Sequence, residues 1–272
     1  MLEYSFLHCK GIAKGTAQRL HKAGFESWAQ ALDEPAGLPL GAKRKQKLIA
    51  DLRSSQDALK ENDMHFFLAR LPKEERWRVL AKYYSEASFL DIETTGFSPY
   101  SSDITLISVL HQGKVHLFVK GQNLKKVITL LGDIKLLVTF CGSNFDIPFL
   151  LEAFRLESFP FAHVDLRWQS NYLGWTGGLK NIEVSLGLSR PKEYKEMSGL
   201  DAVELWEDYW QSKNNKLLNR LKAYSLLDVL SLQLLMLHLL KAKNHEFIFP
   251  ELEKLKNNFG SYKFIEDLLH KS

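Results

Sequence analysis

The sequence predicts an α/β fold, with helices on both faces of a mixed sheet and a small all-α domain before it. Two observations support this fold class. Residues 1–84 show helical spacing interrupted by glycine and proline, whereas short apolar, alternating runs begin at residue 87. The order of these runs, a strand hairpin followed by strand–helix–strand units, indicates a sheet with both antiparallel and parallel pairs.

The first 55 residues are expected to form short helices separated by glycine-rich turns. One helix should end and the next begin within residues 7–16, and Gly24 should end the helix at residues 16–23. Further helices are predicted at residues 27–32 and 43–52, with a proline-containing loop at 35–39. Residues 56–84 then form a charged helical connector that is broken at Pro72.

The second domain is predicted at residues 85–244, followed by a helical tail at 245–272. Its strands are expected at residues 88–93, 104–110, 115–119, 136–140 and 163–166, of which the second and third form a hairpin. Helices are expected at residues 124–131 and 145–156, and the chain is mainly helical after residue 178, with its longest helix at 216–242.

Composition places the chain among ordinary globular proteins. Hydrophobic residues make up 45% and charged residues 25% of its 272 residues, and the net charge is +4. Residues 1–90 carry 15 Lys and Arg against 11 Asp and Glu, whereas the remainder carries 21 of each. The excess positive charge therefore lies in the first third, which suits a nucleic-acid-binding segment but is small enough to arise by chance.

The two cysteines and the apolar runs bear on the cellular setting. Cys9 and Cys141 are far apart and form no CxxC pair, so neither a disulfide framework nor a structural zinc site is expected. The apolar run at residues 226–240 is interrupted by polar residues, and the N-terminus lacks a signal-peptide pattern. We therefore expect a cytoplasmic protein without a membrane partner.

Asp91 and Glu93 are the first candidate site residues. Residues two apart on a strand point to the same face, so these carboxylates project together while Leu90 and Ile92 face the other way. Two adjacent carboxylates repel each other, and a divalent cation would offset that repulsion. An edge strand with a solvated face is the alternative.

Asp146 and Asp228 extend the candidate site. Asp146 follows an apolar strand and opens a helix, where it either reaches the same crevice or only complements the helix dipole. Asp228 stands in a largely apolar helix, four residues after Tyr224 and on the same helix face. It would either bind a cation or lie on a narrow polar stripe. Oxygen ligands of this kind suit Mg²⁺ or Mn²⁺.

Together these residues resemble the three motifs of the DEDD exonuclease superfamily, which is DnaQ-like. The motifs are FLDIETTG at residues 89–96, FD at 145–146 and YSLLD at 224–228, whose tyrosine is similar to that of the DEDDy branch. The wider context resembles the YprB-like ribonuclease H-like proteins over roughly residues 85–242. The segments that carry this resemblance are TFCGSNFDIPFL at 139–150, HVDL at 163–166, GGLKNIE at 177–183 and AVELW at 202–206.

The resemblance implies a ribonuclease H-like fold and a two-metal 3′→5′ exonuclease. Two Mg²⁺ or Mn²⁺ ions would be held by Asp91, Glu93, Asp146 and Asp228. Tyr224 would orient the attacking water. The terminal nucleotide would be contacted by Thr94, Thr95, Gly96, Phe97 and Asn144, with Phe97 either stacking on a base or lying in the core. Asp165 would be an acid behind the ligands or, alternatively, a helix N-cap.

The chain also departs from the family pattern. Cys141 and Ser225 stand where the family often has asparagine, which puts the fit of the substrate in doubt rather than the metal ligands. At the N-terminus, FLHCKGIAKGTAQRL at residues 6–20 resembles a helix-hairpin-helix, although Ala13 replaces a usual glycine. This resemblance implies contacts to a nucleic-acid backbone from Lys10, Gly11, Lys14, Gly15 and Arg19. A helical cap without a binding role is the alternative.

Three functions remain open at this point. The leading expectation is an exonuclease acting on single-stranded or frayed ends, with DNA expected over RNA. A structure-specific or RNA-processing nuclease would use the same site. A non-catalytic nucleic-acid-binding protein is the third, and the complete set of four acids with Tyr224 argues against it. Protein partners and the role of residues 245–272 are not predicted.

Overall fold

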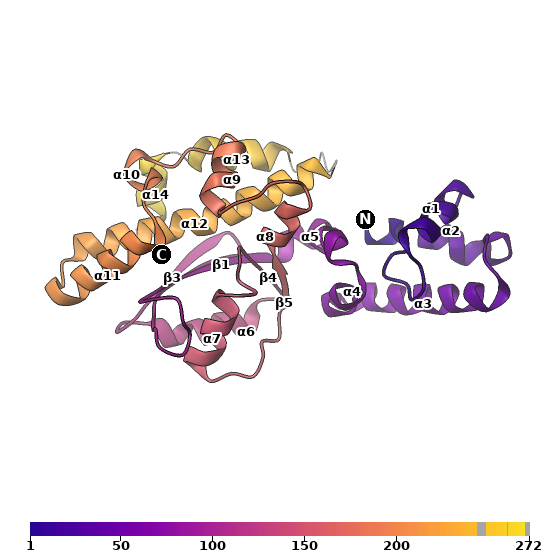
Figure 1. Ribbon diagram of the computed structural model, residues 1–272, viewed down its shortest axis with the longest axis horizontal. Coiled ribbons are helices and arrows are strands. Elements are labelled where there is room, and N and C mark those ends of the chain that lie inside the picture. Colours follow the sequence, from indigo (N-terminus) through magenta and orange to yellow (C-terminus); the bar gives the residue numbers. More distant parts are fainter. Residues whose placement is uncertain (244–248, 260, 270–272) are drawn as a thin grey trace. The chain divides into compact units, whose positions relative to one another are not determined.

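A computed structural model describes residues 1–243, 249–259 and 261–269. The chain divides into two compact units, residues 1–84 and residues 85–272 (Figure 1). The first unit contains helices only, and the second contains a five-stranded sheet with helices, which confirms the predicted fold class. Residues 56–84, expected as a connector, belong to the same unit as the first 55 residues.

The N-terminal unit is built around α3, its longest helix (Figure 1). Its core contains Trp28 and Phe67, whose rings stack with centroids 6.1 Å apart. Ser27 caps α2 in a reciprocal capping box with Gln30, which explains why a helix begins there. The elements are η1 (Leu2–Tyr4), α1 (Lys14–Lys22), α2 (Trp28–Asp33), η2 (Pro35–Gly37), α3 (Ala42–Lys60), α4 (Met64–Arg70), η3 (Lys73–Glu75) and α5 (Trp77–Lys82).

The expected helix before residue 11 is not present. Residues 7–11 form turns, and only the 3₁₀ turn η1 precedes them. Gly11 has a positive φ of 83°, a conformation that glycine adopts without strain. In the structure, therefore, Gly11 belongs to a turn that leads into α1, and no α-helix precedes this turn in the described residues.

The second unit has a sheet with strand order β3-β2-β1-β4-β5. β1 pairs antiparallel with β2 and parallel with β4, so β1 is the central strand of a mixed sheet. The β2–β3 pair is the predicted hairpin. The strands are β1 (Ala87–Thr94), β2 (Ile104–His111), β3 (Lys114–Val119), β4 (Leu136–Thr139) and β5 (Ala162–Asp165).

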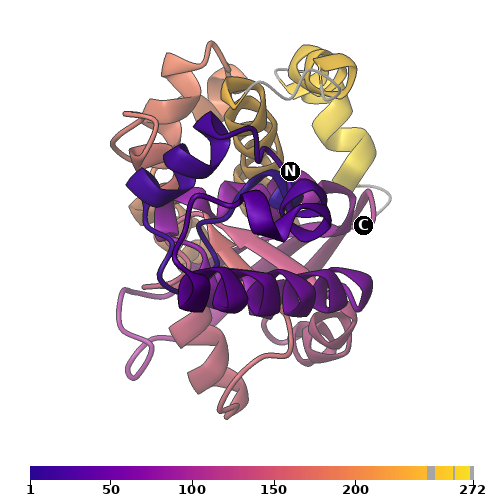
Figure 2. The same cartoon turned by 90° about the vertical axis from the view of Figure 1, so that its right-hand side faces the viewer.

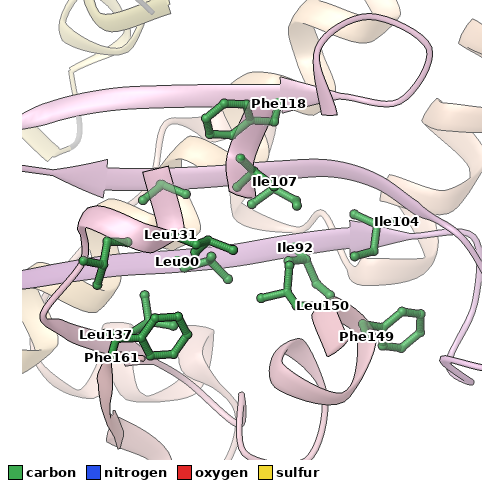
Figure 3. Packing of buried hydrophobic residues seen from close by; sticks show 13 residues of the cluster. Leu90, Ile92, Ile104, Ile107, Phe118, Leu131, Leu137, Phe149, Leu150 and Phe161 are labelled. Atoms are coloured by element: carbon green, nitrogen blue, oxygen red, sulfur yellow. The ribbon is translucent and has the colours of Figure 1, made fainter. Parts of the chain in front are cut away.

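Helices cover both faces of this sheet. Leu90 and Ile92 of β1 point into an apolar core with Leu131 of α6 and with Phe149 and Leu150 of α7 (Figure 3). The opposite face is covered by α12, which contacts β1 and β2 (Figure 1). Figure 2 shows helices on both faces of the sheet in a view turned by 90°.

The remaining elements of this unit are mostly helical, as expected. They are η4 (Tyr84–Glu86), which begins at the last residue of the first unit, η5 (Leu124–Lys126), α6 (Val127–Asp133), α7 (Asp146–Phe154), α8 (Leu166–Asn171), α9 (Leu179–Ser185), α10 (Lys192–Lys195), α11 (Gly199–Ser212), α12 (Asn215–Ala242), α13 (Phe249–Phe259) and α14 (Tyr262–Leu269). The expected tail at 245–272 includes α13 and α14, and its residues 245–248, 260 and 270–272 lie outside the described part.

The helix α12 is the longest described helix of this unit and packs against β1 and β2. Its most apolar 18-residue window has a mean hydropathy of 1.6, enough in length and composition to cross a membrane. However, 89% of that window is buried inside the protein, as in the core helix of a globular domain.

Candidate metal centre

The strand β1 presents Asp91 and Glu93 on the face that α12 covers. Alternation along the strand places Leu90 and Ile92 on the opposite face, in the apolar core. The pairing of β1 with β2 shifts register directly after Glu93, so a bulge ends the regular ladder at this carboxylate. Such bulges redirect the chain beside a site, and here the loop at residues 95–103 follows.

The helix α12 brings a third acid to these two. Ligand oxygens of Asp91, Glu93 and Asp228 lie within 4.8 Å of one another. Tyr224 lies one turn before Asp228 and is also buried. The structure thus brings together three of the four acids that the sequence predicted, although Asp228 follows Glu93 by 135 residues in the chain.

Asp146 lies beside this group but outside the three-residue cluster. It is buried at the start of α7, and the backbone of Ile92, between the two acids of β1, lowers the pKa of its carboxyl group. Burial, followed by repulsion from Asp165 and Asp228, raises the pKa of Asp146 to about 7.

Asp165 shapes the turn that leads to Asp146. Its carboxylate accepts backbone hydrogen bonds from Cys141 (2.8 Å), Ser143 (3.1 Å) and Arg167 (3.0 Å), the last as the N-cap of α8. Cys141 adopts a left-handed conformation with a φ of 66°. In the same turn a Cβ on Gly142 would lie 2.1 Å from the Thr139 hydroxyl, so only glycine fits there.

Burial and mutual repulsion dominate the electrostatics of the centre. The pKa of Asp91 is raised well above its usual range by burial, then by repulsion from Asp228 and Glu93. Burial and Asp228 likewise raise the pKa of Glu93, and burial raises that of Asp228. A cation that binds here would relieve this repulsion, and it would favour the ionised form of every acid.

The residues present fit a hard divalent cation. Their donors are carboxylate oxygens, the ligands that Mg²⁺ and Mn²⁺ prefer. Moreover, Glu93 Oε1 is buried with no hydrogen-bond partner among the described residues. A buried, unpaired carboxylate oxygen is costly, and coordination to a cation would satisfy it.

Three charged residues at the centre were missed from the sequence: Lys180, Glu183 and Arg190. Lys180 Nζ donates to the Tyr224 hydroxyl over 3.0 Å and also bonds the carbonyl of Met197. Arg190 Nη2 donates to Asp228 Oδ1 over 2.6 Å, and Arg190 also pairs with Glu183. The GGLKNIE segment marked the region of the first two, but nothing in the local pattern marked Arg190.

A cavity of about 250 Å³ opens beside the acids. Of the predicted substrate contacts, Thr94, Gly96 and Phe97 line it, whereas Thr95 and Asn144 do not. The Thr95 hydroxyl instead accepts from the Asp103 backbone and closes the loop. Phe97 is 77% exposed, so the alternative of a core position does not hold. The cavity is lined by Asp91, Ile92, Glu93, Thr94, Gly96, Phe97, Phe145, Gly199, Val203, Tyr224 and Asp228.

The predicted backbone contacts of the N-terminal unit lie around the turn before α1. Lys14 forms an ion pair with Glu74 at 2.9 Å, and the backbone of Lys10 donates to Asp51. On α1, Arg19 Nη2 donates to the Thr16 hydroxyl oxygen over 3.4 Å. Gly15 is in the first turn of α1, and Arg44 Nη2 donates to the carbonyl of Gly11 over 2.9 Å.

The sheet unit matches a known protein family. The family model of the RNase_H superfamily matches residues 88–240. No curated protein sequence matches the chain.

Three solved structures are similar to the chain. A family B DNA polymerase from Pyrobaculum calidifontis is 19% identical, with 68% of this chain aligned to 27% of that chain and a TM-score of 0.44. NrnC from Brucella melitensis is 20% identical over 70% of this chain and 87% of that chain, with a TM-score of 0.41. The same NrnC with bound Mg²⁺ is 19% identical, with coverages of 70% and 87% and a TM-score of 0.40.

Proposed function

The chain belongs to the RNase H superfamily, and on that premise we propose that it is a metal-dependent 3′→5′ exonuclease of the DEDDy type. The observation that carries this proposal is the cluster formed by the half-buried Asp91 and the buried Glu93 and Asp228, with Asp146 beside it. No hydrogen bonds within the described part satisfy Glu93 Oε1, so the group is built to hold cations rather than to stabilise the fold.

In the proposed site, two Mg²⁺ or Mn²⁺ ions would be held by Asp91 and Glu93 of β1, Asp146 at the start of α7 and Asp228 of α12. The bound ions would supply an activated water and would stabilise the charge on the phosphate and the leaving 3′ oxygen. The acids come from β1, α7 and α12, three elements fixed by the sheet and its core, so their relative positions are set before substrate arrives.

Tyr224 is proposed to orient the attacking water as a neutral phenol. Burial, followed by repulsion from Asp228 and Glu93, raises its pKa, so the hydroxyl keeps its proton. Lys180 donates to the same oxygen, which leaves the phenolic hydrogen free to be donated to an acceptor in the cavity. Lys180 therefore sets the direction in which Tyr224 donates.

The cavity favours the end of a single strand as the substrate. Its volume of about 250 Å³ is small for a ligand site and suits one terminal nucleotide rather than a duplex. Phe97 stands exposed at this cavity and is placed to stack on a base. Stacking is tolerant of sequence, so we propose a nuclease without strong base preference, with DNA preferred to RNA.

The N-terminal unit is proposed to tether the enzyme to nucleic acid through phosphate contacts. Lys10 precedes Gly11 in the turn, Lys14 and Arg19 lie on α1 after it, and Arg44 of α3 donates to the Gly11 carbonyl. Neutralising Lys10, Lys14 and Arg19 together should weaken nucleic-acid binding. The slope of log affinity against log salt concentration should become shallower by the equivalent of up to about three phosphate contacts. An unchanged affinity would contradict the tether, and hydrolysis of a short single strand should remain as the control.

The decisive test is degradation of 5′-labelled single-stranded DNA and RNA with Mg²⁺, Mn²⁺ or EDTA. We expect a metal-dependent ladder that shortens from the 3′ end and is absent in Asp91→Ala and Asp228→Ala. Defined internal fragments would instead indicate a structure-specific nuclease with the same centre. Metal-independent binding with no cleavage of either polymer would contradict the enzymatic proposal.

A further inference from the structure

Arg190 is a buried arginine in contact with the carboxylate centre. Its side chain is 2% exposed, and Nη2 lies 2.6 Å from Asp228 Oδ1. Nε donates to Glu183 Oε2 over 2.7 Å, while Nη2 also pairs with Glu183 Oε1. The guanidinium carbon lies 5.9 Å from the centroid of the Tyr224 ring. One cation is therefore shared between a proposed metal ligand and a second acid.

The position of Arg190 is fixed from two sides. It stands just before α10, where Pro191 is the N-cap residue, and it reaches back to Glu183 of α9. Two nitrogens of Arg190 meet two oxygens of Glu183, the bidentate geometry that only arginine offers. A guanidinium held in this way cannot swing away when another cation arrives at Asp228.

Charge balance decides what this cation does. Burial alone would lower the pKa of Arg190, but Asp228 and Glu183 outweigh burial and raise it, so the guanidinium stays charged. It lowers the pKa of Asp228 against the effect of burial. A permanent positive charge at hydrogen-bond distance from a ligand also repels any metal ion that the same ligand binds.

We propose that Arg190 is a fixed internal cation of the carboxylate centre, which compensates Asp228 in the metal-free protein and thereby limits the affinity for divalent metal. This inference rests on the proposed function, because it takes the acids to be metal ligands. Glu183 sets the strength of the effect, since it neutralises part of the charge of Arg190. Arg190 is thus a positioning residue that acts through Asp228.

The two partners should shift metal affinity in opposite directions. Arg190→Gln removes the competing charge, so Mn²⁺ should bind about tenfold more tightly or better. Glu183→Gln keeps Arg190 but removes its neutralising partner, so Mn²⁺ should bind about tenfold more weakly. A purely structural role of this ion pair would weaken binding in both variants.

The test is calorimetric titration of Mn²⁺ into the metal-free full-length protein at about pH 8, above the pKa of about 7 of Asp146. Circular dichroism of each variant establishes that it is folded. Opposite shifts for Arg190→Gln and Glu183→Gln support the proposal, whereas shifts in the same direction or no shifts overturn it.

A second variant keeps the test decisive if Arg190→Gln does not fold. Arg190→Lys loses the two-nitrogen contact with Glu183 but keeps a positive charge between Glu183 and Asp228. Because the charge sets the effect, its Mn²⁺ affinity should remain within about threefold of wild type, while Glu183→Gln weakens binding about tenfold. Equal affinities of wild type, Arg190→Lys and Glu183→Gln would overturn the inference while leaving the proposed function standing. Failure of the wild-type protein to bind Mn²⁺ would overturn the metal centre itself, and the inference with it.

Discussion

Replacing Asp146 by asparagine should stabilise the metal-free protein at neutral and alkaline pH while it abolishes hydrolysis. Asp146 is 3% exposed, and its pKa is raised from an ordinary 3.8 to about 7, mainly by burial. The folded protein therefore retains a proton that the unfolded chain releases. As pH rises from about 4 to 7, ionisation favours the unfolded state, and stability falls.

The size of this effect follows from the width of the pKa gap. One pKa unit corresponds to about 1.4 kcal/mol, so a pKa of about 7 against 3.8 gives up to about 4 kcal/mol at pH 8. Asparagine carries no charge at any pH and keeps one acceptor oxygen beside the backbone of Ile92. We expect Asp146→Asn to be about 2 to 4 kcal/mol more stable than wild type at pH 8.

The assay is urea unfolding in EDTA at about pH 4, 6 and 8, for wild type and Asp146→Asn. The difference in free energy of unfolding should be near zero at the lowest pH and should grow with pH. Asp208→Asn is the matched control, because Asp208 lies on the exposed face of α11, where a substitution should change the free energy of unfolding by less than about 0.5 kcal/mol. A variant that is less stable than wild type at every pH would refute the reasoning.

Two further predictions concern the same region. Tyr224→Phe should lower kcat about tenfold to a hundredfold, because the hydroxyl that accepts from Lys180 is lost, while Mn²⁺ affinity measured by calorimetry should not change. Cys141→Asn should raise the free energy of unfolding by about 0.5 to 1 kcal/mol, because asparagine tolerates the left-handed φ of 66° better than cysteine. Thermal unfolding in EDTA measures the second effect, and a lower melting temperature would contradict it.

The sequence predicted the fold where local pattern and burial agree. The alternation around β1 placed Asp91 and Glu93 on one face, and the helical spacing of α12 placed Tyr224 and Asp228 one turn apart. Both patterns depend only on the geometry of the element in question. For this reason the strands and the longest helix agree with the sequence prediction to within a few residues, and three of the four predicted acids lie together.

What the sequence did not reveal depends on contacts between distant segments. Arg190 and Asp228 are 38 residues apart, and only the packing of the α9–α10 connection against α12 joins them. Likewise, the glycine signal at Gly11 fits either a helical hairpin or a turn, and the chain before it lacks the regular structure of a helix. In both cases the deciding information is tertiary, so periodicity could not supply it.

The sign of the stability change on neutral replacement should separate the proposed metal ligands from the acids that stabilise the fold. Asp91, Glu93 and Asp146 stand among like charges, Asp91 half-buried and the other two buried. A neutral replacement at each should therefore relieve repulsion in the metal-free protein. Asp165 is buried too, but its carboxylate accepts three backbone N–H groups of the β4–α7 turn and α8. An asparagine there presents one acceptor oxygen instead of two, so Asp165→Asn should destabilise the protein at neutral pH. Asp146 follows the β4–α7 turn, and Asp165 ends β5 and accepts hydrogen bonds from that turn. Opposite signs of the stability change at these two positions would distinguish a proposed metal ligand from a structural acid without any assay of hydrolysis.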